Sequence, residues 1–336
     1  MGDPGGIGAE VIVKALADES LRRSARFVVY GLHEQLAYAA DRAELNPFWF
    51  RIPADHVTRI ESGVVVADFD EFSLAVDPPR RPTAESGRAS MRFVEAAVDD
   101  ARTRTIDAVV TAPINKSAWE LAGFSYPGHT EYLARRFKCR RVTMMFVGGS
   151  LRIALASIHD ALFDLRHKFT IGLVFQPIDL MHTALQDWFG LSAPKIAVAG
   201  LNPHAGENGR IGDEEIRIIE PAIVMARDAG IDAVGPFPAD SLFRRAAGGE
   251  FDGVVAMYHD QGLIPIKLLA FDEAVNLTLG LPIVRTSVDH GTAFDIAGRN
   301  RAECGSMKAA IRTAVDLTRR RLHLGASVAR EVNRAI

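Results

Sequence analysis

The sequence predicts an α/β protein with a largely parallel β-sheet. Along the 336 residues, short β-branched and apolar runs alternate with longer amphipathic stretches. Several of the short runs are apolar without interruption, which is typical of strands that are covered on both faces. The length of the chain favours two lobes.

The predicted strands are the short apolar runs, and they lie in chain order at residues 26–30, 107–111, 142–147, 152–156, 195–199 and 253–257. The predicted helices repeat apolar residues at spacings of three and four, and they cover residues 10–17, 90–102, 214–229 and about 307–322. Residues 77–83 are rich in proline, so we expect a surface loop there and not a hinge between domains.

The composition excludes several classes of protein. With 48% hydrophobic and 24% charged residues, the chain is not a disordered one. No apolar run reaches the roughly 18 residues of a membrane-spanning helix, and the glycine-rich, acidic start does not have the regions of a signal peptide. Cys139 and Cys304 suit reduced thiols, and a formal charge of −3 gives no drive towards nucleic acid or anionic membranes. We therefore expect a cytoplasmic protein without nucleic-acid or membrane partners.

Histidines follow three of the predicted strands. His159, His204 and His259 each lie within a few residues of a strand end, where ligands gather in open parallel sheets. Three imidazoles with an open fourth position suit a catalytic divalent metal, and zinc is the first choice by ligand type. Their spacing matches no local zinc motif, so the fold or two subunits must bring them together. Taken singly, each is an ordinary polar loop residue.

Two segments could hold an anion at the start of a helix. Residues 2–8 form a glycine-rich turn that matches neither nucleotide-binding fingerprint, so a plain turn is the leading alternative. Residues 127–131 place His129 and Thr130 where helix amides and the helix dipole favour a phosphate or carboxylate. Thr130 as a simple helix cap is the equally favoured alternative.

Lys267, Asn276 and Arg285 lie at intervals of nine in an otherwise apolar segment. Cations in apolar surroundings need an anionic partner, which is either an internal carboxylate, such as Asp272 or Glu273, or a bound anion. Arg285 would offer a two-pronged donor to a planar anion, and Lys267 a point charge or a proton.

Together these segments closely resemble the 4-hydroxythreonine-4-phosphate dehydrogenase family of vitamin B6 biosynthesis. The matching motifs lie in order at residues 2–8, 127–131, 200–207, 257–262, 275–282 and 285–293, and the resemblance covers nearly the whole chain. The polar loop at residues 288–299 is also similar to the loop that holds the adenosine end of the cofactor in isocitrate and isopropylmalate dehydrogenases. From the sequence alone, a capped turn between lobes explains this loop equally well.

The resemblance implies a two-lobed α/β/α sandwich of the isocitrate/isopropylmalate dehydrogenase-like type, with the active site in the cleft between the lobes. We expect residues 1–128 and about 286–336 to form the cofactor lobe. Residues from about 129 to 285 would then form the lobe with the metal, the substrate and the dimer interface.

The resemblance also implies roles for individual residues. The metal ligands are His159, His204 and His259, contributed across a homodimer interface. The substrate-binding positions are His129, Thr130, Lys267, Asn276 and Arg285, and the cofactor-binding positions are Asp289, His290, Gly291, Thr292 and Asp295. Asp260 and Lys267 are our candidates for proton transfer, because they lie near the third metal loop in the sequence.

The implied reaction is the oxidation of 4-phosphooxy-L-threonine at C3 by NAD or NADP. Loss of carbon dioxide then gives 3-amino-2-oxopropyl phosphate. A divalent metal, Zn, Mg or Co, would stabilise the negative charge that develops on the C3 oxygen. Arg299 and Arg301 are available for the 2′-phosphate of NADP.

Three alternatives remain open. A paralogous dehydrogenase of the family would act on 4-phospho-threonate or on an aromatic dihydrodiol dicarboxylate. A metal-dependent hydrolase or aldolase would use the three histidines without a redox cofactor. A degenerate binding protein would have no activity.

The sequence departs from the family pattern in two places. Met1 stands at the last position of the family's first strand, so either the start is truncated or the edge of the first sheet is rearranged. Asp160-Ala161-Leu162 follow His159 in place of an apolar residue and a proline. The family's loop geometry therefore carries over less directly at His159 than at His204.

Overall fold

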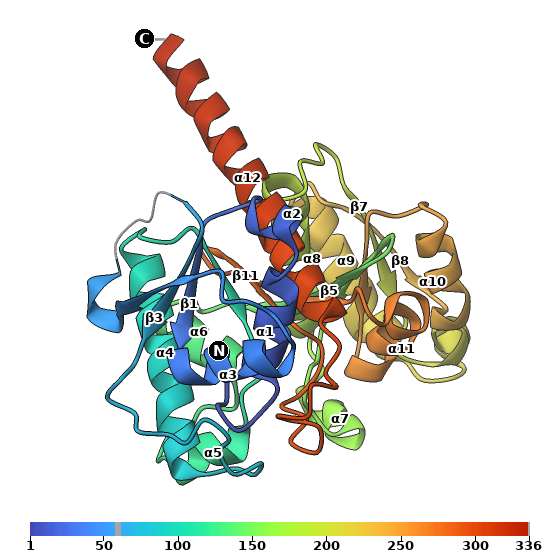
Figure 1. Cartoon of the computed structure of the whole chain (residues 1–336). Coiled ribbons are helices and arrows are strands. Elements are labelled where there is room, and N and C mark those ends of the chain that lie inside the picture. The colour runs from blue at the N-terminus through green and yellow to red at the C-terminus, as the bar shows by residue number, and fades with distance from the viewer. Residues whose placement is uncertain (58–61, 335–336) are drawn as a thin grey trace. The chain divides into compact units, whose positions relative to one another are not determined.

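The computed structural model describes residues 1–57 and 62–334, with side chains up to residue 323 (Figure 1). The chain divides into two compact units, each described separately below. Unit 1 consists of Met1–Cys139 and Leu281–Asp316, and unit 2 of Arg140–Gly280 and Leu317–Ile336. These units differ from the predicted lobes at residues 129–139, 281–285 and 317–336. The functions assigned to the two lobes stay predictions.

Unit 1 contains two groups of parallel strands. Its strands are β1 (Phe27–Gly31), β2 (Phe50–Pro53), β3 (Val64–Asp68), β4 (Ala108–Thr111) and β11 (Val284–Ser287). The first three pair in the order β1-β3-β2, and β11 pairs with β4. Its helices are α1 (Gly8–Leu16), α2 (Glu19–Arg22), α3 (His33–Arg42), η1 (Ala54–His56), α4 (Ala84–Arg102), α5 (Lys116–Leu121) and α6 (His129–Arg136). The last helix, α12 (Gly305–Arg334), begins in unit 1.

Unit 2 is built on strands in the order β10-β5-β6-β9-β7-β8. They are β5 (Thr143–Gly148), β6 (Leu151–Leu155), β7 (Lys195–Ala199), β8 (Asp232–Phe237), β9 (Gly253–Ala256) and β10 (Val275–Leu279). β5 pairs antiparallel with β10 and with β6, and the other pairs are parallel. The helical segments are η2 (Leu162–Asp164), α7 (Leu165–Lys168), α8 (Ile171–Asp187), η3 (Pro203–Gly209), η4 (Glu215–Ile219), α9 (Glu220–Asp228), α10 (Ala239–Ala247) and α11 (His259–Ala270).

The predicted α/β class with a mostly parallel sheet is confirmed. All six predicted strands are present within one residue of their expected bounds. The helix predicted at residues 214–229 is a π-turn followed by α9, and the proline-rich segment 77–83 is a loop inside unit 1. The strands β2, β3, β8, β10 and β11 were not predicted. In β10 and β11, polar residues that include Asn276 and Arg285 stand where the other strands have a continuous apolar run.

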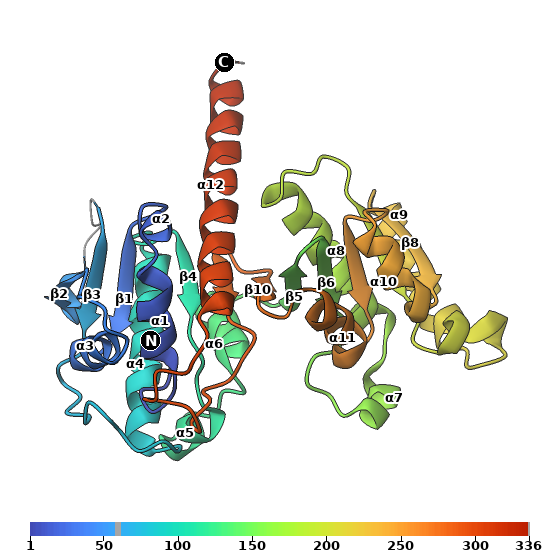
Figure 2. The same cartoon turned by 45° about the vertical axis from the view of Figure 1, so that its right-hand side comes forward.

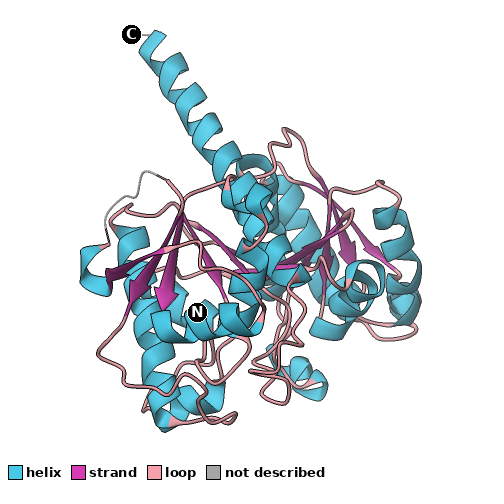
Figure 3. Ribbon diagram, in the orientation of Figure 1, coloured by secondary structure: helices cyan, strands magenta, loops and turns pink. Residues whose placement is uncertain are grey.

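Buried side chains from helices and strands form the core of each unit. In unit 1, Val13 of α1, Leu36 of α3 and Phe93 of α4 belong to one buried cluster with Val66 of β3. Figure 2 shows these three helices beside β1 and β3. Figure 3 shows the strands of each unit with helices beside them. No helix among the described residues is long and apolar enough to cross a membrane.

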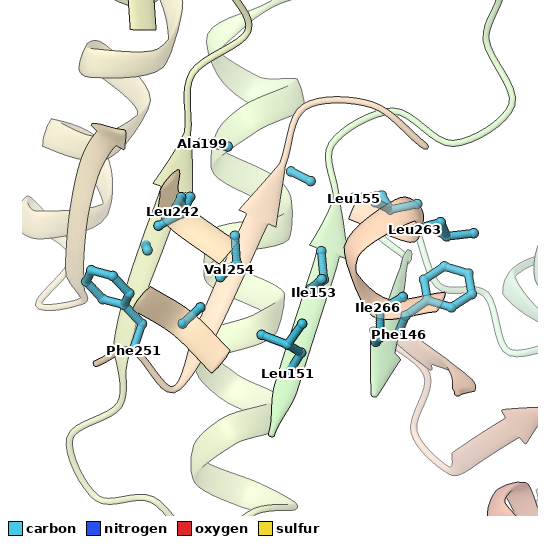
Figure 4. Close-up of a cluster of buried hydrophobic side chains, with 13 residues drawn as sticks. Phe146, Leu151, Ile153, Leu155, Ala199, Leu242, Phe251, Val254, Leu263 and Ile266 are labelled. Atoms are coloured by element: carbon cyan, nitrogen blue, oxygen red, sulfur yellow. The ribbon is translucent and has the colours of Figure 1, made fainter. Parts of the chain in front are cut away.

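Helix α11 packs closely against β6 in the core of unit 2. Leu263 and Ile266 of α11 belong to one buried cluster with Ile153 and Leu155 of β6 (Figure 4). A Cβ atom on Gly262 would come within 2.7 Å of the Leu155 side chain, so glycine is needed for this approach. The packing brings the first residue of α11, His259, to the end of the sheet where β6 and β9 finish.

Candidate functional site

The loops with the three predicted metal ligands leave the same edge of the sheet in unit 2. Strands β6, β9 and β7 are adjacent and parallel, so their carboxyl ends lie together. His159 follows β6, His204 lies in η3 after β7, and His259 begins α11 after β9. The sheet order therefore explains how residues 45 and 55 positions apart reach one region.

His159 and His259 are brought next to each other. Their ring centroids lie 6.0 Å apart. Two imidazoles that share one metal at about 2.1 Å per nitrogen have centroids roughly 5–6 Å apart, so this pair fits a shared divalent ion. Nδ1 of His259 lies 2.7 Å from Oδ1 of Asp260. This contact leaves Nε2 available as a ligand, in the carboxylate–histidine arrangement common at metal sites.

His204 does not join this pair within one chain. In residues 1–57 and 62–334, no three His, Cys, Asp or Glu side chains are grouped so that they could hold a metal. His204 lies in a left-handed segment with φ values of 54° at His204, 52° at Ala205 and 75° at Gly206. A non-glycine residue in this conformation costs about 1–2 kcal/mol, so neighbouring groups must hold the loop.

Unit 1 contains a buried polar cluster around Arg285. Arg285 on β11 is 3% exposed, and its Nη2 donates a hydrogen bond to Oγ1 of Thr111, 2.7 Å away at the end of β4. Burial lowers the pKa of Arg285 to about 10, while the nearby charge of Glu131 opposes this shift. Arg285 is therefore still a cation at neutral pH, in surroundings where a bound anion would be strongly favoured.

His129 is the second member of this cluster. It is buried at the start of α6, beside the ring of Trp119, and its Nε2 has no hydrogen-bond partner among the described residues. Burial, and next the charge of Arg285, hold the pKa of His129 well below 6.5. The imidazole is therefore neutral at pH 7, with a nitrogen available to a ligand.

The amino terminus of α6 has no side-chain cap. The N-cap position is Gly128, and Thr130 lies inside the first turn, so the alternative of Thr130 as the cap is wrong. Thr130 is 4% exposed. Uncapped helix amides beside a buried arginine suit a phosphate or carboxylate.

The other two predicted substrate residues lie in unit 2. Lys267 is on α11, 6.0 Å from the ring of Phe271, and Asn276 is on β10. Oδ1 of Asn276 is buried without a partner among the described residues, and its Nδ2 has only a weak contact with the sulfur of Met144. Asn276 therefore offers an acceptor to a ligand that carries a hydrogen-bond donor.

The predicted cofactor loop packs on the glycine-rich turn at the start of the chain. The amide of Ile7 donates to the carbonyl of Thr292, and a Cβ atom on Gly6 would lie 2.9 Å from the same carbonyl oxygen. The glycines of residues 2–8 therefore serve close backbone packing, which favours the plain turn over an anion site. The amide of Asp289 donates a hydrogen bond to Oγ of Ser306, 3.2 Å away.

Two features of this loop fit a bound dinucleotide. Nε2 of His290 is buried without a partner among the described residues, so a ligand group could use it. A Cβ atom on Gly291 would meet nothing within 4 Å, and Asp295 is exposed. The loop thus contains a glycine with space around it, a buried imidazole nitrogen without a partner among the described residues, and an exposed carboxylate.

Comparison with known proteins gives a consistent result. The sequence matches the family described as pyridoxal phosphate biosynthetic protein PdxA over residues 23–314. The 4-hydroxythreonine-4-phosphate dehydrogenase of Desulfosudis oleivorans is 47% identical over 317 residues, 94% of each chain. The D-threonate 4-phosphate dehydrogenase of Cupriavidus necator is 45% identical over 328 residues, 96% of each chain.

The fold is shared as well. The crystal structure of 4-hydroxythreonine-4-phosphate dehydrogenase from Klebsiella pneumoniae superimposes with a TM-score of 0.84 at 38% identity, covering 95% of this chain and 98% of that one. The chain belongs to the PdxA family. The family predicted from the sequence motifs is confirmed, and with it the prediction of an oxidoreductase. As a dehydrogenase of the PdxA family, the chain uses a nicotinamide cofactor.

Sequence reasoning missed residues that support the PdxA site. Thr111 accepts the hydrogen bond of Arg285, and it could have been found as a hydroxyl at the carboxyl end of a predicted strand. Gln261 and Glu215 bridge backbone groups of the histidine loops. Gln261 lies in the family motif at residues 257–262, but no sequence pattern indicates that Glu215 is buried.

Proposed function

We propose that this PdxA-family protein oxidises 4-phosphooxy-L-threonine at C3 and decarboxylates the product to 3-amino-2-oxopropyl phosphate. The buried arginine at an uncapped helix end carries this proposal. A phosphorylated amino acid has two anionic groups, and Arg285 with the amides of α6 suits one of them. Neutral His129 would donate a hydrogen bond, and Oδ1 of Asn276 would accept one from the substrate's ammonium group.

The cofactors have separate candidate sites. NAD or NADP would be held by Asp289, His290, Gly291, Thr292 and Asp295, and would supply a hydride acceptor for the oxidation at C3. The divalent cation, Zn, Mg or Co, would be held by His159, His204 and His259, and it supplies Lewis acidity to the C3 oxygen. Arg299, which is exposed beyond this loop, and Arg301 are the candidates to contact a 2′-phosphate.

The chain's own groups would orient the reactants and move protons. Asp260 accepts from Nδ1 of His259 and would fix that ring with Nε2 directed outward. Lys267, a few turns along the same helix, is our candidate to exchange a proton with the C3 oxygen. Asp260 remains the second candidate for this proton transfer.

We propose a homodimer that shares the metal site. Two of the three histidines meet within one chain, and α11, which begins at His259, leaves a large apolar face uncovered. Leu268 is 82% exposed, and Ile264, Leu269 and Phe271 on the same helix are exposed as well. Large exposed apolar patches mark interaction surfaces. A second copy seated on α11 would cover this face and complete the histidine set. We place the protein in the cytoplasm.

A substrate comparison tests this function. Oxidation is measured with NAD and with NADP on 4-phosphooxy-L-threonine, 4-phospho-threonate and an aromatic dihydrodiol dicarboxylate. We expect the highest kcat/KM for the first. Turnover of 4-phospho-threonate alone would assign the chain to the activity of its Cupriavidus necator relative. If neither dinucleotide raises the thermal midpoint at millimolar concentration, the redox reaction is wrong and a non-redox metal enzyme is favoured.

A further inference from the structure

A buried carboxylate lies directly behind the loop that carries His204. Glu215 begins the π-turn Glu215–Ile219 and is 2% exposed. Its Oε1 accepts hydrogen bonds from the amides of Leu201, at 2.8 Å, and Asn202, at 2.7 Å. Its Oε2 accepts from Nδ2 of Asn202 at 2.9 Å. The residues it holds lie within three positions of His204.

The loop fits tightly around this carboxylate. A Cβ atom on Gly206 would lie 2.6 Å from Oε2 of Glu215, and one on Gly200 would lie 3.2 Å from Oε1. Residues on both sides of His204 therefore approach the same side chain. Because His204 itself has a left-handed φ of 54°, the backbone at this residue depends on contacts from outside the loop.

A second side chain links this loop to that of His259. Gln261, in the first turn of α11, donates from Nε2 to the carbonyl of Gly200 at 2.7 Å. Its Oε1 accepts from the amide of Met257 at 2.7 Å. Gln261 thereby connects the segments that follow β7 and β9. A displacement of the loop bound to Glu215 would therefore move the backbone next to His259.

We propose that Glu215 is a positioning residue, which holds the left-handed loop so that His204 is presented for metal binding. The inference rests on the proposed metal site. Glu215 is too deeply buried to be a ligand, and its carboxylate oxygens are occupied by amide donors. Groups that orient metal ligands commonly change metal affinity by about 10–100-fold when they are replaced.

The test uses the full-length protein and Co²⁺ as the probe. Glu215→Gln keeps the side-chain volume but replaces one carboxylate oxygen by an NH₂ group. This group would face N–H donors of Leu201 or Asn202 and could not accept their hydrogen bonds. The control is Glu220→Gln, the same charge change at an exposed position at the start of α9. We expect Co²⁺ to bind Glu215→Gln at least 10-fold more weakly than wild type, with altered visible absorption bands. Glu220→Gln should match wild type.

Limited proteolysis of the metal-free protein gives an independent readout. Arg210 is exposed at the end of the same loop, so trypsin should cut there faster in Glu215→Gln than in either wild type or Glu220→Gln. If Glu215→Gln does not fold, Asn202→Ala, which removes only the side-chain bonds, should give the same changes in smaller size.

The outcomes separate the two proposals. If wild type shows no cobalt spectrum, the metal proposal is overturned, and the role of Glu215 in metal binding with it. If wild type binds Co²⁺ and Glu215→Gln has the same spectrum and affinity, only the positioning role is overturned. A lower thermal midpoint with an unchanged spectrum would mean that Glu215 serves stability alone.

Discussion

Single residues carry the chemistry of unit 1 because burial changes what each can do. A surface arginine is a hydrated charge with little preference among anions. Arg285 lies in the core with its fork partly fixed by Thr111, and burial lowers its pKa only to about 10. It therefore stays charged while being oriented. His129, buried beside it, is held neutral, so the cluster combines one fixed cation with one neutral hydrogen-bonding ring.

Replacing Arg285 by lysine tests whether substrate binding needs the planar guanidinium group as well as its positive charge. Lysine keeps the positive charge but loses the planar donors. A hydrogen bond to a charged group contributes about 1.5–3 kcal/mol, so we expect KM for the phosphorylated substrate to rise roughly 10- to 100-fold. The control is Arg299→Lys on the exposed part of the cofactor loop, which should leave this KM unchanged. An unchanged KM in Arg285→Lys would remove Arg285 from the substrate site.

The neutral state of His129 predicts a dependence of stability on pH. Its folded-state pKa lies well below 6.5, so below about pH 6.5 the unfolded chain binds a proton that the folded chain does not. Stability from this residue is present above that pH and is lost as the pH falls, by up to about 1.4 kcal/mol per pH unit. The drop in thermal midpoint between pH 7.5 and 5.5 should be smaller in His129→Gln than in wild type. Equal drops would contradict a buried neutral imidazole.

At the scale of elements, the loop η3 and the helix α11 position two of the proposed metal ligands, His204 and His259. The loop runs through consecutive left-handed residues, a conformation that does not persist without outside support. The helix begins with His259 and lies close to β6 because Gly262 has no side chain. One element is positioned by hydrogen bonds to Glu215, and the other by apolar packing.

Two glycine variants separate backbone conformation from crowding in this loop. Gly206 and Gly190 both have left-handed φ values, 75° and 73°, but a Cβ atom on Gly190 would meet nothing within 4 Å, while one on Gly206 would lie 2.6 Å from Glu215. Gly190→Ala should cost about 1 kcal/mol of stability. Gly206→Ala should cost more and should also weaken metal binding, as measured by Co²⁺ titration. Equal effects of the two variants would show that Glu215 does not restrict this loop.

The exposed face of α11 can be tested as a dimer interface. Leu269→Asp places a charge on this face, and Leu121→Asp makes the same change on α5 at a residue that is equally exposed, 61% in both cases. Charge in the core of an apolar interface is costly. Sedimentation analysis should therefore detect monomers of Leu269→Asp at concentrations where Leu121→Asp remains dimeric. Dimers of equal stability would place the interface elsewhere.

At the scale of the whole molecule, the predicted site residues are divided between the two units. His129, Thr130 and Arg285 lie in unit 1 with the cofactor loop, and the metal ligands lie in unit 2 with Lys267 and Asn276. In the proposed function, each unit would therefore supply part of the groups that one reaction needs. Oxidation should require both parts, since neither contains an anion site, a metal site and a cofactor loop together.

Removal of the metal tests this dependence in the assembled protein. Treatment with a chelator should abolish oxidation of 4-phosphooxy-L-threonine, and added Zn²⁺, Mg²⁺ or Co²⁺ should restore it. NAD or NADP should still raise the thermal midpoint of the chelated protein, because the predicted cofactor loop belongs to unit 1 and the three proposed metal ligands belong to unit 2. Full activity in chelated buffer would refute the metal assignment.

Much of the fold could be predicted because many of its strands are short, continuous runs of apolar residues. β4, β7 and β9 are of this kind, and each was found. β3 was missed although it is a buried apolar run. β10 and β11 were missed because polar residues, among them Asn276 and Arg285, stand in these buried strands. A polar residue in a buried strand is expected at a binding site. The residues that made these strands difficult to predict are therefore also predicted substrate-binding residues.

The sequence by itself determined the α/β class, the family and the identity of the residues that can do chemistry, since side-chain types and local periodicity are written along the chain. Only the tertiary structure decided which of them meet. Strand order places His159 beside His259, burial keeps His129 neutral, and Glu215 supports the His204 loop. These facts depend on contacts between distant segments, and a linear pattern does not encode the distances, the dielectric surroundings or the hydrogen bonds that those contacts create.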